Sequence, residues 1–176
     1  MVTIETIRTV CVKDRKISAM PSATSAGTRS TDRLHLDRFV PYRLAVLSNI
    51  VSMSIATAYE RDFALSIPEW RVVAVLARFP NLSAIEVGER AALDKVAVSR
   101  AVRNLVAARR LVRSFDKGDR RRSILKLTQS GKAVYTRVAP RALRYEQKLL
   151  GALSSAEQRA FDRLISRLID RARKID

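Results

Sequence analysis

The feature that most constrains the fold is a change in the spacing of apolar residues near position 110. Before it, apolar residues recur at intervals of three and four, which predicts a helix with one buried stripe. That stripe consists of Val98, Ala101, Val102 and Leu105. After it, the period falls to two in residues 111–115, and residues 123–127 repeat an extended pattern around Ile124. Residues 116–119 have turn composition, so the sequence predicts a helix followed by a two-stranded hairpin.

The same helix has an opposite face of small, polar and cationic residues. At about 100° per residue, the positions facing away from the buried stripe can be assigned directly. They are Val96, Ser99, Arg100, Arg103 and Ala107. Such a face suits close approach to bases and phosphates, and Lys95 lies near enough to the helix start to reach a backbone phosphate. The alternative for the two arginines is an ordinary solvated helix surface.

Two short helices are expected immediately before this one. Ser66 with Glu69, and Ser83 with Glu86, have the spacing of capping boxes, and Asp94 is a suitable N-cap residue for the helix with the two faces. The first helix should run from Ile67 to about Phe79 and the second should end near Ala91. Two short helices joined by a tight turn are typical of a helix-turn-helix.

The tip of the expected hairpin is strongly basic. It contains Arg120, Arg121 and Arg122. One interpretation is that Asp119 holds Arg121 as a structural pair, which leaves Arg120 or Arg122 for contact with DNA. Between residues 94 and 126 there are eleven Lys or Arg and three Asp, a local net charge of +8. Nearly half of the total charge of +17 therefore lies in under a fifth of the chain.

A charge of +17 favours a polyanionic partner, because Lys and Arg that neutralise phosphates release condensed counterions. Nucleic acid is the first expectation and an anionic membrane surface is the second. A non-specific architectural nucleic-acid binder fits the charge as well as a sequence-specific regulator does. The two differ in operator preference, which only the regulator should show.

Helices are also expected on both sides of this central part. Residues 34–64 have helical apolar spacing, with Pro41 at the start or at a kink, and the run from Leu44 to Tyr59 carries no charge. A helix so apolar needs cover on more than one side, and a partner subunit would supply it. After the hairpin, Thr128 should cap a helix to about Leu150, kinked at Pro140.

The last helix should begin at a capping box formed by Ser154 and Glu157. Its apolar residues share one stripe, and arginines cover much of the rest of its surface. The stripe consists of Phe161, Leu164, Ile165, Leu168 and Ile169.

Several classes of function have little support in the sequence. One histidine and one cysteine provide neither a metal cluster nor an internal disulfide, and no nucleophile and base pair is identifiable, so we expect no enzyme, no metal and no cofactor. No apolar stretch reaches the roughly 20 residues of a membrane span and no secretory signal is visible, so a cytoplasmic protein is expected. Residues 1–32 have the composition of a flexible extension. Its alternatives are an arm on a partner subunit with Cys11 as a redox sensor, or a true start at Met20.

Together these residues resemble the MarR family of bacterial and archaeal regulators, over roughly residues 36–171. The matching residues are Pro68-Glu69-Trp70, Leu76 with Pro80 and Ser83, Asp94-Lys95 with Val98-Ser99-Arg100, Leu111-Val112 with Arg113, and Asp119-Arg120-Arg121 closing on Leu127-Thr128 and Gly131. The last set is the most specific to the family.

The resemblance implies a mainly α fold with a small β-hairpin wing. Residues 33–176 would form the MarR-type domain, with a winged helix-turn-helix at 66–131 and dimerisation helices at 34–64 and 132–176. It implies a homodimer that binds double-stranded DNA at a palindromic operator, with the helix after Asp94 in the major groove and the wing in the minor groove. Cysteine oxidation, the family's other switch, is disfavoured because Cys11 lies outside the match.

The resemblance also implies a small aromatic or phenolic effector in a cleft between the two regions. Tyr42, Tyr59 and Phe63 either line that pocket or fill the dimer interface, and Trp70 is either core or part of the pocket. The family usually has glycine after the recognition helix, where this chain has Arg110. A left-handed backbone at Arg110 would be strained.

Overall fold

The computed structural model describes residues 34–57, 59–115 and 123–175. The chain divides into two units, residues 1–35 and residues 36–176, and the second contains all of the helices and strands discussed below. The expected flexible extension, its cysteine and the tip of the wing lie outside the described residues.

Among the described residues, seven helices and one two-stranded antiparallel sheet follow each other along the chain. In chain order they are α2 (Val40–Ala56), α3 (Glu60–Phe63), α4 (Ile67–Arg78), α5 (Ala84–Ala91), α6 (Lys95–Ala107), β1 (Leu111–Phe115), β2 (Ser123–Leu127), α7 (Gln129–Leu150) and α8 (Ser155–Ala172). The expected fold class, mainly α with a β-hairpin, is confirmed.

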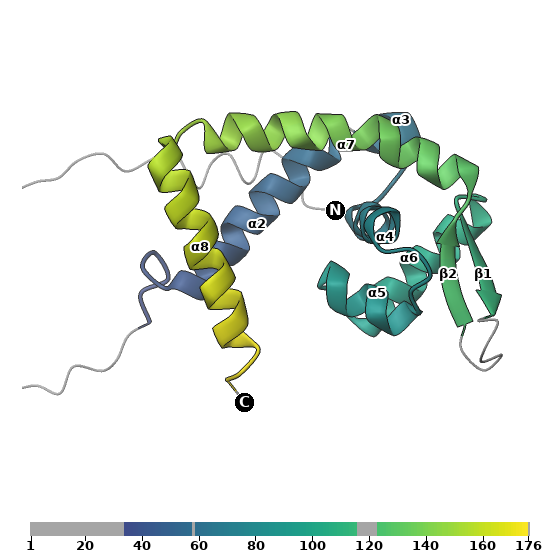
Figure 1. The fold of residues 1–176 in the computed structure, drawn as a ribbon, viewed down its shortest axis with the longest axis horizontal. Coiled ribbons are helices and arrows are strands. Elements are labelled where there is room, and N and C mark those ends of the chain that lie inside the picture. The colour runs from purple at the N-terminus through teal and green to yellow at the C-terminus, as the bar shows by residue number, and fades with distance from the viewer. Residues whose placement is uncertain (1–33, 58, 116–122, 176) are drawn as a thin grey trace, which may run out of the picture. The chain divides into compact units, whose positions relative to one another are not determined.

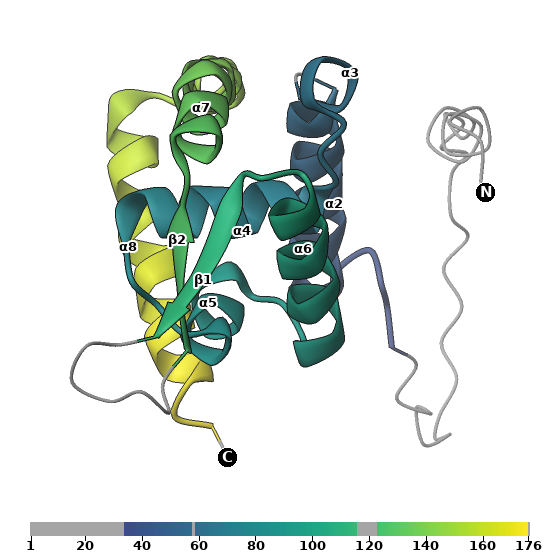
Figure 2. The same ribbon diagram turned by 90° about the vertical axis from the view of Figure 1, so that its right-hand side faces the viewer.

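Helix α7 connects two groups of elements (Figure 1). Its N-terminal part follows β2 and packs against α4, and its C-terminal end leads into α8. Figure 2 shows the hairpin beside α6, with α4 crossing behind both. Across the hairpin, Leu111 pairs with Leu127 and Phe115 with Ser123, and a single bridge from Leu82 extends the outer edge of β2.

The helix starts lie where the capping residues predict. The side chains of Ser66, Ser83 and Ser154 each accept a hydrogen bond from the backbone N–H three residues later, and the glutamate there accepts one from the serine N–H. Asp94 and Thr128 cap α6 and α7 in the same way through one side-chain oxygen each. Each cap pairs an N–H that would otherwise lack a partner at a helix start.

The buried core lies in the helix-turn-helix and its immediate neighbours. Val72 and Val73 of α4, Val102 of α6 and Val138 of α7 are fully buried, together with Leu125 of β2. Helix α2 contributes only Ala56 to the fully buried residues, and α8 contributes none. These two helices therefore add little to the core of the single chain.

Large apolar side chains remain exposed on α2 and α8. On α2 they include Leu44, Leu47, Ile50 and Met53, and on α8 they are Phe161, Leu164, Leu168 and Ile169. All four residues on α8 belong to the apolar stripe expected from the sequence. Ile165, the fifth member, is half-buried. The stripe is therefore present, but it is not covered within one chain.

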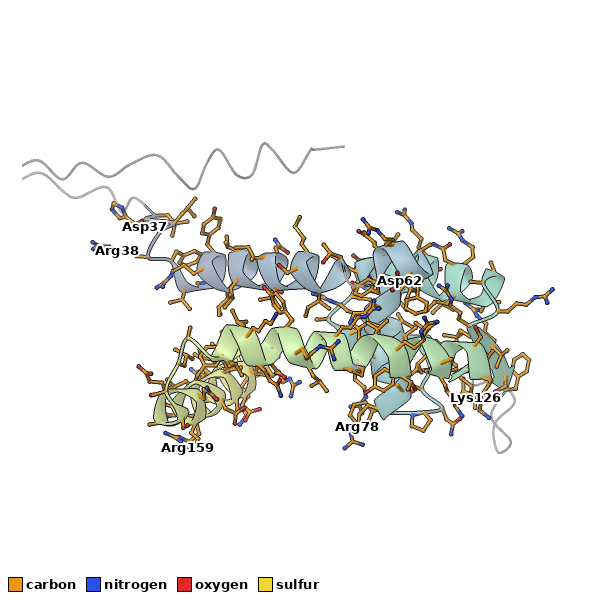
Figure 3. All side chains as sticks on the ribbon, turned by 90° about the horizontal axis from the view of Figure 1, so that it is seen from above. Asp37, Arg38, Asp62, Arg78, Lys126 and Arg159 are labelled. Carbon is orange, nitrogen blue, oxygen red and sulfur yellow. The ribbon has the colours of Figure 1, made fainter. Side chains whose placement is uncertain are left out.

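The segment expected to be helical from residue 34 to residue 64 is divided in two. Regular structure begins at Val40 with Pro41 in the first turn, as Pro41 predicts, and α2 ends at Ala56. Tyr59 then turns into the core before the short helix α3. Burial of one large aromatic ring thus accompanies the interruption of an otherwise continuous apolar pattern. Arg141 of α7 forms an ion pair with Asp62 of α3, with 2.6 Å between Nη1 and Oδ2 (Figure 3).

Candidate nucleic-acid interface

Helix α6 has the two faces that its sequence predicts. The whole apolar stripe is buried, from Val98 to Leu105, and it packs against α4 and α5. On the opposite side Val96, Ser99, Arg100, Arg103 and Ala107 are all exposed. Lys95, the first residue of the helix, is exposed as well. The helix therefore presents a small and cationic surface while its other side anchors it.

A hydrogen bond from an exposed side chain of α6 to a buried carboxylate of α4 joins the two helices. Glu69 is only 7% exposed, and its Oε2 accepts from the Ser66 N–H at 2.8 Å as part of the cap of α4. Its Oε1 accepts from Nδ2 of Asn104 on α6, also at 2.8 Å. One carboxylate thus caps α4 and holds α6 at once. Because a buried carboxylate without partners is costly, this pair favours one orientation of α6.

The turn after α6 is held by side chains and backbone from distant parts of the chain. Nη2 of Arg110 donates to the carbonyl oxygen of Phe63 at 2.7 Å. The Arg110 carbonyl accepts from the Thr128 N–H at 3.1 Å, where α7 begins. A Cβ at Gly131 would collide with that same carbonyl oxygen, so only glycine permits this approach.

The expected left-handed residue after α6 is present, but it is Arg109 and not Arg110. Arg109 has φ 55°, and its N–H donates to the Val106 carbonyl at 2.9 Å. The Arg110 N–H donates to the Leu105 carbonyl at 2.9 Å. This pair of bonds is a Schellman ending, which places the left-handed residue one position earlier than expected. Arg110 therefore lies after the left-handed residue, and its side chain donates to the Phe63 carbonyl oxygen.

The described strands of the hairpin form the base of the expected wing. Leu111 and Leu125 are buried, while Arg113 and Lys126 are exposed. The Leu125 N–H donates to the Leu82 carbonyl at 2.8 Å, which joins the hairpin to the turn before α5. The residues expected to enter or support the minor-groove contact lie outside the described residues: Asp119, Arg120, Arg121 and Arg122.

The structure brings three of the four expected pocket residues together. The rings of Tyr59 and Trp70 have centroids 5.6 Å apart, and Phe63 packs against the same core beneath the guanidinium of Arg137. Tyr42 lies apart: it is in the first turn of α2 and 46% exposed, about 20 Å along the helix from Ala56.

Burial changes the chemistry of Tyr59. Its side chain is 1% exposed, and desolvation together with the charge of Glu60 raises its pKa to about 12, although Arg71 acts in the opposite direction. The phenol is therefore neutral at physiological pH. Trp70 and Phe63 are half-buried and keep some accessible ring surface.

A cavity of about 540 Å³ lies between α4, β2 and α7, and its lining does not include Tyr59, Phe63 or Trp70. Tyr135 lines it and stacks on Trp70 with centroids 6.1 Å apart. Lys126 and Lys132 line the same cavity. An aromatic molecule with an acidic group would match such a lining.

Sequence reasoning missed the residues that hold α6 in place. The sequence patterns assign no role to Asn104 or Tyr135, and they indicate Arg110 only as the residue at the turn after the helix. A local pattern identifies a cap such as Ser66 with Glu69, but the second partner of Glu69 is 35 residues away. No spacing rule reports such a pair.

In the part of the chain that the structure describes, no helix is both long and apolar enough to cross a membrane.

Comparison with known proteins finds similarity to transcriptional regulators. The model of the MarR family matches residues 65–122. Two crystal structures of the PcaV transcriptional regulator from Streptomyces coelicolor are similar. One, in complex with its natural ligand, is 29% identical over 80% of this chain and 98% of that chain, with a TM-score of 0.67. The other is 30% identical over 78% and 100%, with a TM-score of 0.57.

A MarR/EmrR family transcriptional regulator from Acinetobacter sp. ADP1 is also similar in structure. It is 26% identical over 81% of this chain and 100% of that chain, with a TM-score of 0.74. No curated protein matches the sequence.

Proposed function

Because the chain belongs to the MarR family of transcriptional regulators, we propose that it is a ligand-responsive homodimeric repressor that binds a palindromic operator. The observation that carries this proposal is the pair of faces on α6. A fully buried stripe opposite an exposed small and cationic one suits a helix that is anchored in its domain and inserted into a major groove. An architectural binder would need charge but no such ordered surface.

The DNA contacts we assign are Lys95, Val96, Ser99, Arg100 and Arg103 on α6, with Arg120, Arg121 and Arg122 in the wing and Asp119 supporting it. Val96, Ser99, Arg100 and Arg103 would face the base pairs, and Lys95 would contact a backbone phosphate. The wing would add affinity through the minor groove. The boundaries we propose are 66–131 for the winged helix-turn-helix and 34–64 with 132–176 for the dimerisation helices.

Dimerisation is supported by the uncovered apolar surfaces of α2 and α8. Ile50 is 53% exposed and Leu164 is 54% exposed, although both belong to continuous apolar stripes. A second copy of this chain would cover them, because a two-fold dimer joins the same surface patch of both subunits. Two α6 helices spaced by about 34 to 36 Å would then reach successive major grooves.

The effector we propose is a small aromatic or phenolic compound. Phe63 and Trp70 would contact it, and the buried Tyr59 would support Trp70 from the core. Tyr42 would contribute only from elsewhere in the dimer, and the cavity lined by Tyr135, which stacks on Trp70, offers further volume. PcaV, which has been seen with its natural ligand, provides a parallel for ligand response in this fold. Trp70 is the only tryptophan, so its fluorescence reports directly on this site.

A gel-shift experiment on the protein's own upstream intergenic region tests the DNA-binding proposal. Wild-type protein should shift that duplex and not a scrambled one, and Arg103→Ala should weaken the shift. Arg159→Ala is the matched control, because it removes the same charge from α8, far from the wing residue Lys126 (Figure 3). Equal binding to both duplexes would instead favour the architectural binder.

Titration with a panel of hydroxybenzoates tests the effector proposal. A binding compound should change Trp70 fluorescence and release the operator in the same concentration range. Release without any change in Trp70 fluorescence would place the effector elsewhere.

A further inference from the structure

Val96 is an apolar residue on the exposed face of α6, on the side of the helix opposite the buried stripe. It is the second residue of the helix, and 67% of its surface is accessible. Leu105, which is 1% exposed, lies nine residues further along, or two and a half turns at 3.6 residues per turn. Val96 therefore projects directly away from the core.

Nothing in the fold of the single chain explains a valine at this position. Valine has a lower helix propensity than alanine, and at this exposure its side chain gains little from burial. Single exposed apolar residues are common on protein surfaces. This one, however, is surrounded by Lys95, Ser99 and Arg100, on the surface that the cationic residues assign to DNA.

The first turn of a recognition helix is the part that contacts base edges. In the major groove, the C5-methyl group of thymine is the distinctive apolar group that a base pair presents. An exposed valine in that turn has the matching chemistry, whereas Ser99 and Arg100, one turn later, have hydrogen-bonding chemistry for neighbouring base pairs.

We propose that Val96 contacts the C5-methyl group of a thymine in each half-site and so selects thymine at that position. This inference rests on the proposed operator-binding function and adds a base identity to it. Burial of one methyl group corresponds to an affinity gain of about four-fold, and two symmetric half-sites together give about fifteen-fold.

The test begins with selection of the preferred duplex from random DNA by the full-length protein. Each thymine of that duplex is then replaced by deoxyuridine, which removes only the methyl group, and the dissociation constant is measured by fluorescence anisotropy at fixed salt. The same series is measured for Val96→Ala. Val112→Ala is the matched control, because Val112 is an exposed valine on β1 and not on α6.

Each half-site should contain one thymine whose replacement by deoxyuridine weakens wild-type binding. Replacement in one half-site should raise the dissociation constant about four-fold, and replacement in both should raise it about fifteen-fold. Val96→Ala should bind the thymine and deoxyuridine duplexes equally at that position, while Val112→Ala should keep the wild-type difference.

If Val96→Ala keeps the difference, or no thymine responds in a duplex that is otherwise selected, this inference is overturned and operator binding stands. If selection yields no preferred sequence, both proposals fall.

Discussion

Replacement of Asn104 by alanine tests how the recognition helix is held. In the native structure Nδ2 of Asn104 donates to Oε1 of Glu69 at 2.8 Å, and Glu69 is 7% exposed. The substitution removes the donor and leaves Oε1 without that partner. The other carboxylate oxygen keeps its bond to the Ser66 N–H, so the cap of α4 survives.

The expected loss is the difference between two opposing effects. A hydrogen bond to a charged group contributes roughly 1.5 to 3 kcal/mol. Because the Asn104 side chain is itself exposed, water can replace part of the lost bond, which places the loss near the middle of that range. Alanine has a better helix propensity than asparagine by roughly 0.6 kcal/mol, which offsets part of the loss. The net decrease in the free energy of unfolding should therefore be about 1.5 kcal/mol.

Urea denaturation at equal protein concentration measures this decrease. Arg103→Ala is the matched control, because Arg103 lies one residue earlier in α6 and is exposed on the face opposite the buried apolar stripe. It should leave the free energy of unfolding within about 0.5 kcal/mol of the wild-type value. A loss below about 0.5 kcal/mol for Asn104→Ala, or an equal loss for both variants, would refute the role of this hydrogen bond.

Three further predictions concern other parts of the molecule. Arg109→Gly should stabilise the protein by about 1 kcal/mol in urea denaturation, because Arg109 has φ 55° at a Schellman ending, and an unchanged midpoint would contradict this reasoning. Ile50→Glu should give a folded monomer by light scattering, since it places a charge in the proposed interface, whereas Val112→Glu should remain dimeric. Tyr59 has a folded-state pKa of about 12 against 10.0 unfolded, so its contribution to stability is complete below pH 10 and is lost between pH 10 and 12. Tyr59→Phe should lessen that alkaline loss, and equal losses would contradict it.

The helix starts and the facing of α6 could be predicted because both depend on local rules. Ser83 and Glu86 lie three residues apart, and the side chain of each accepts a hydrogen bond from the backbone N–H of the other. This pair does not depend on the rest of the chain. The buried stripe of α6 follows from helical geometry alone once Asp94 fixes the start. Such features can be predicted because the residues that determine them lie within a few positions of one another in the sequence.

The interruption between α2 and α3 could not be predicted in this way. The apolar spacing continues across it, and the chain breaks the helix where Tyr59 enters the core among α4 and α7 residues that are distant in sequence. The extent of α7, by contrast, is confirmed: the helix runs from Gln129 to Leu150 with Pro140 inside it, as expected from the Thr128 cap. Proline predicts a lost hydrogen bond there, but the contacts along α7 decide whether the helix ends.

The position of the left-handed residue after α6 shows a different limit. The family pattern pointed to Arg110, yet the Schellman bonds place the conformation at Arg109. A one-residue shift is within the usual uncertainty of helix ends. Here it has a consequence, because Arg110 is then free to bind the Phe63 carbonyl and tie α6 to the aromatic cluster.

The central claim is that the exposed face of α6 reads DNA sequence. The most direct measurement is the ratio of two dissociation constants, for the selected operator and for a scrambled duplex of the same length and composition, at one salt concentration. A sequence-reading α6 predicts a ratio of about 10³ or more for the wild-type protein and a smaller ratio for Arg103→Ala. A wild-type ratio near one would contradict the claim.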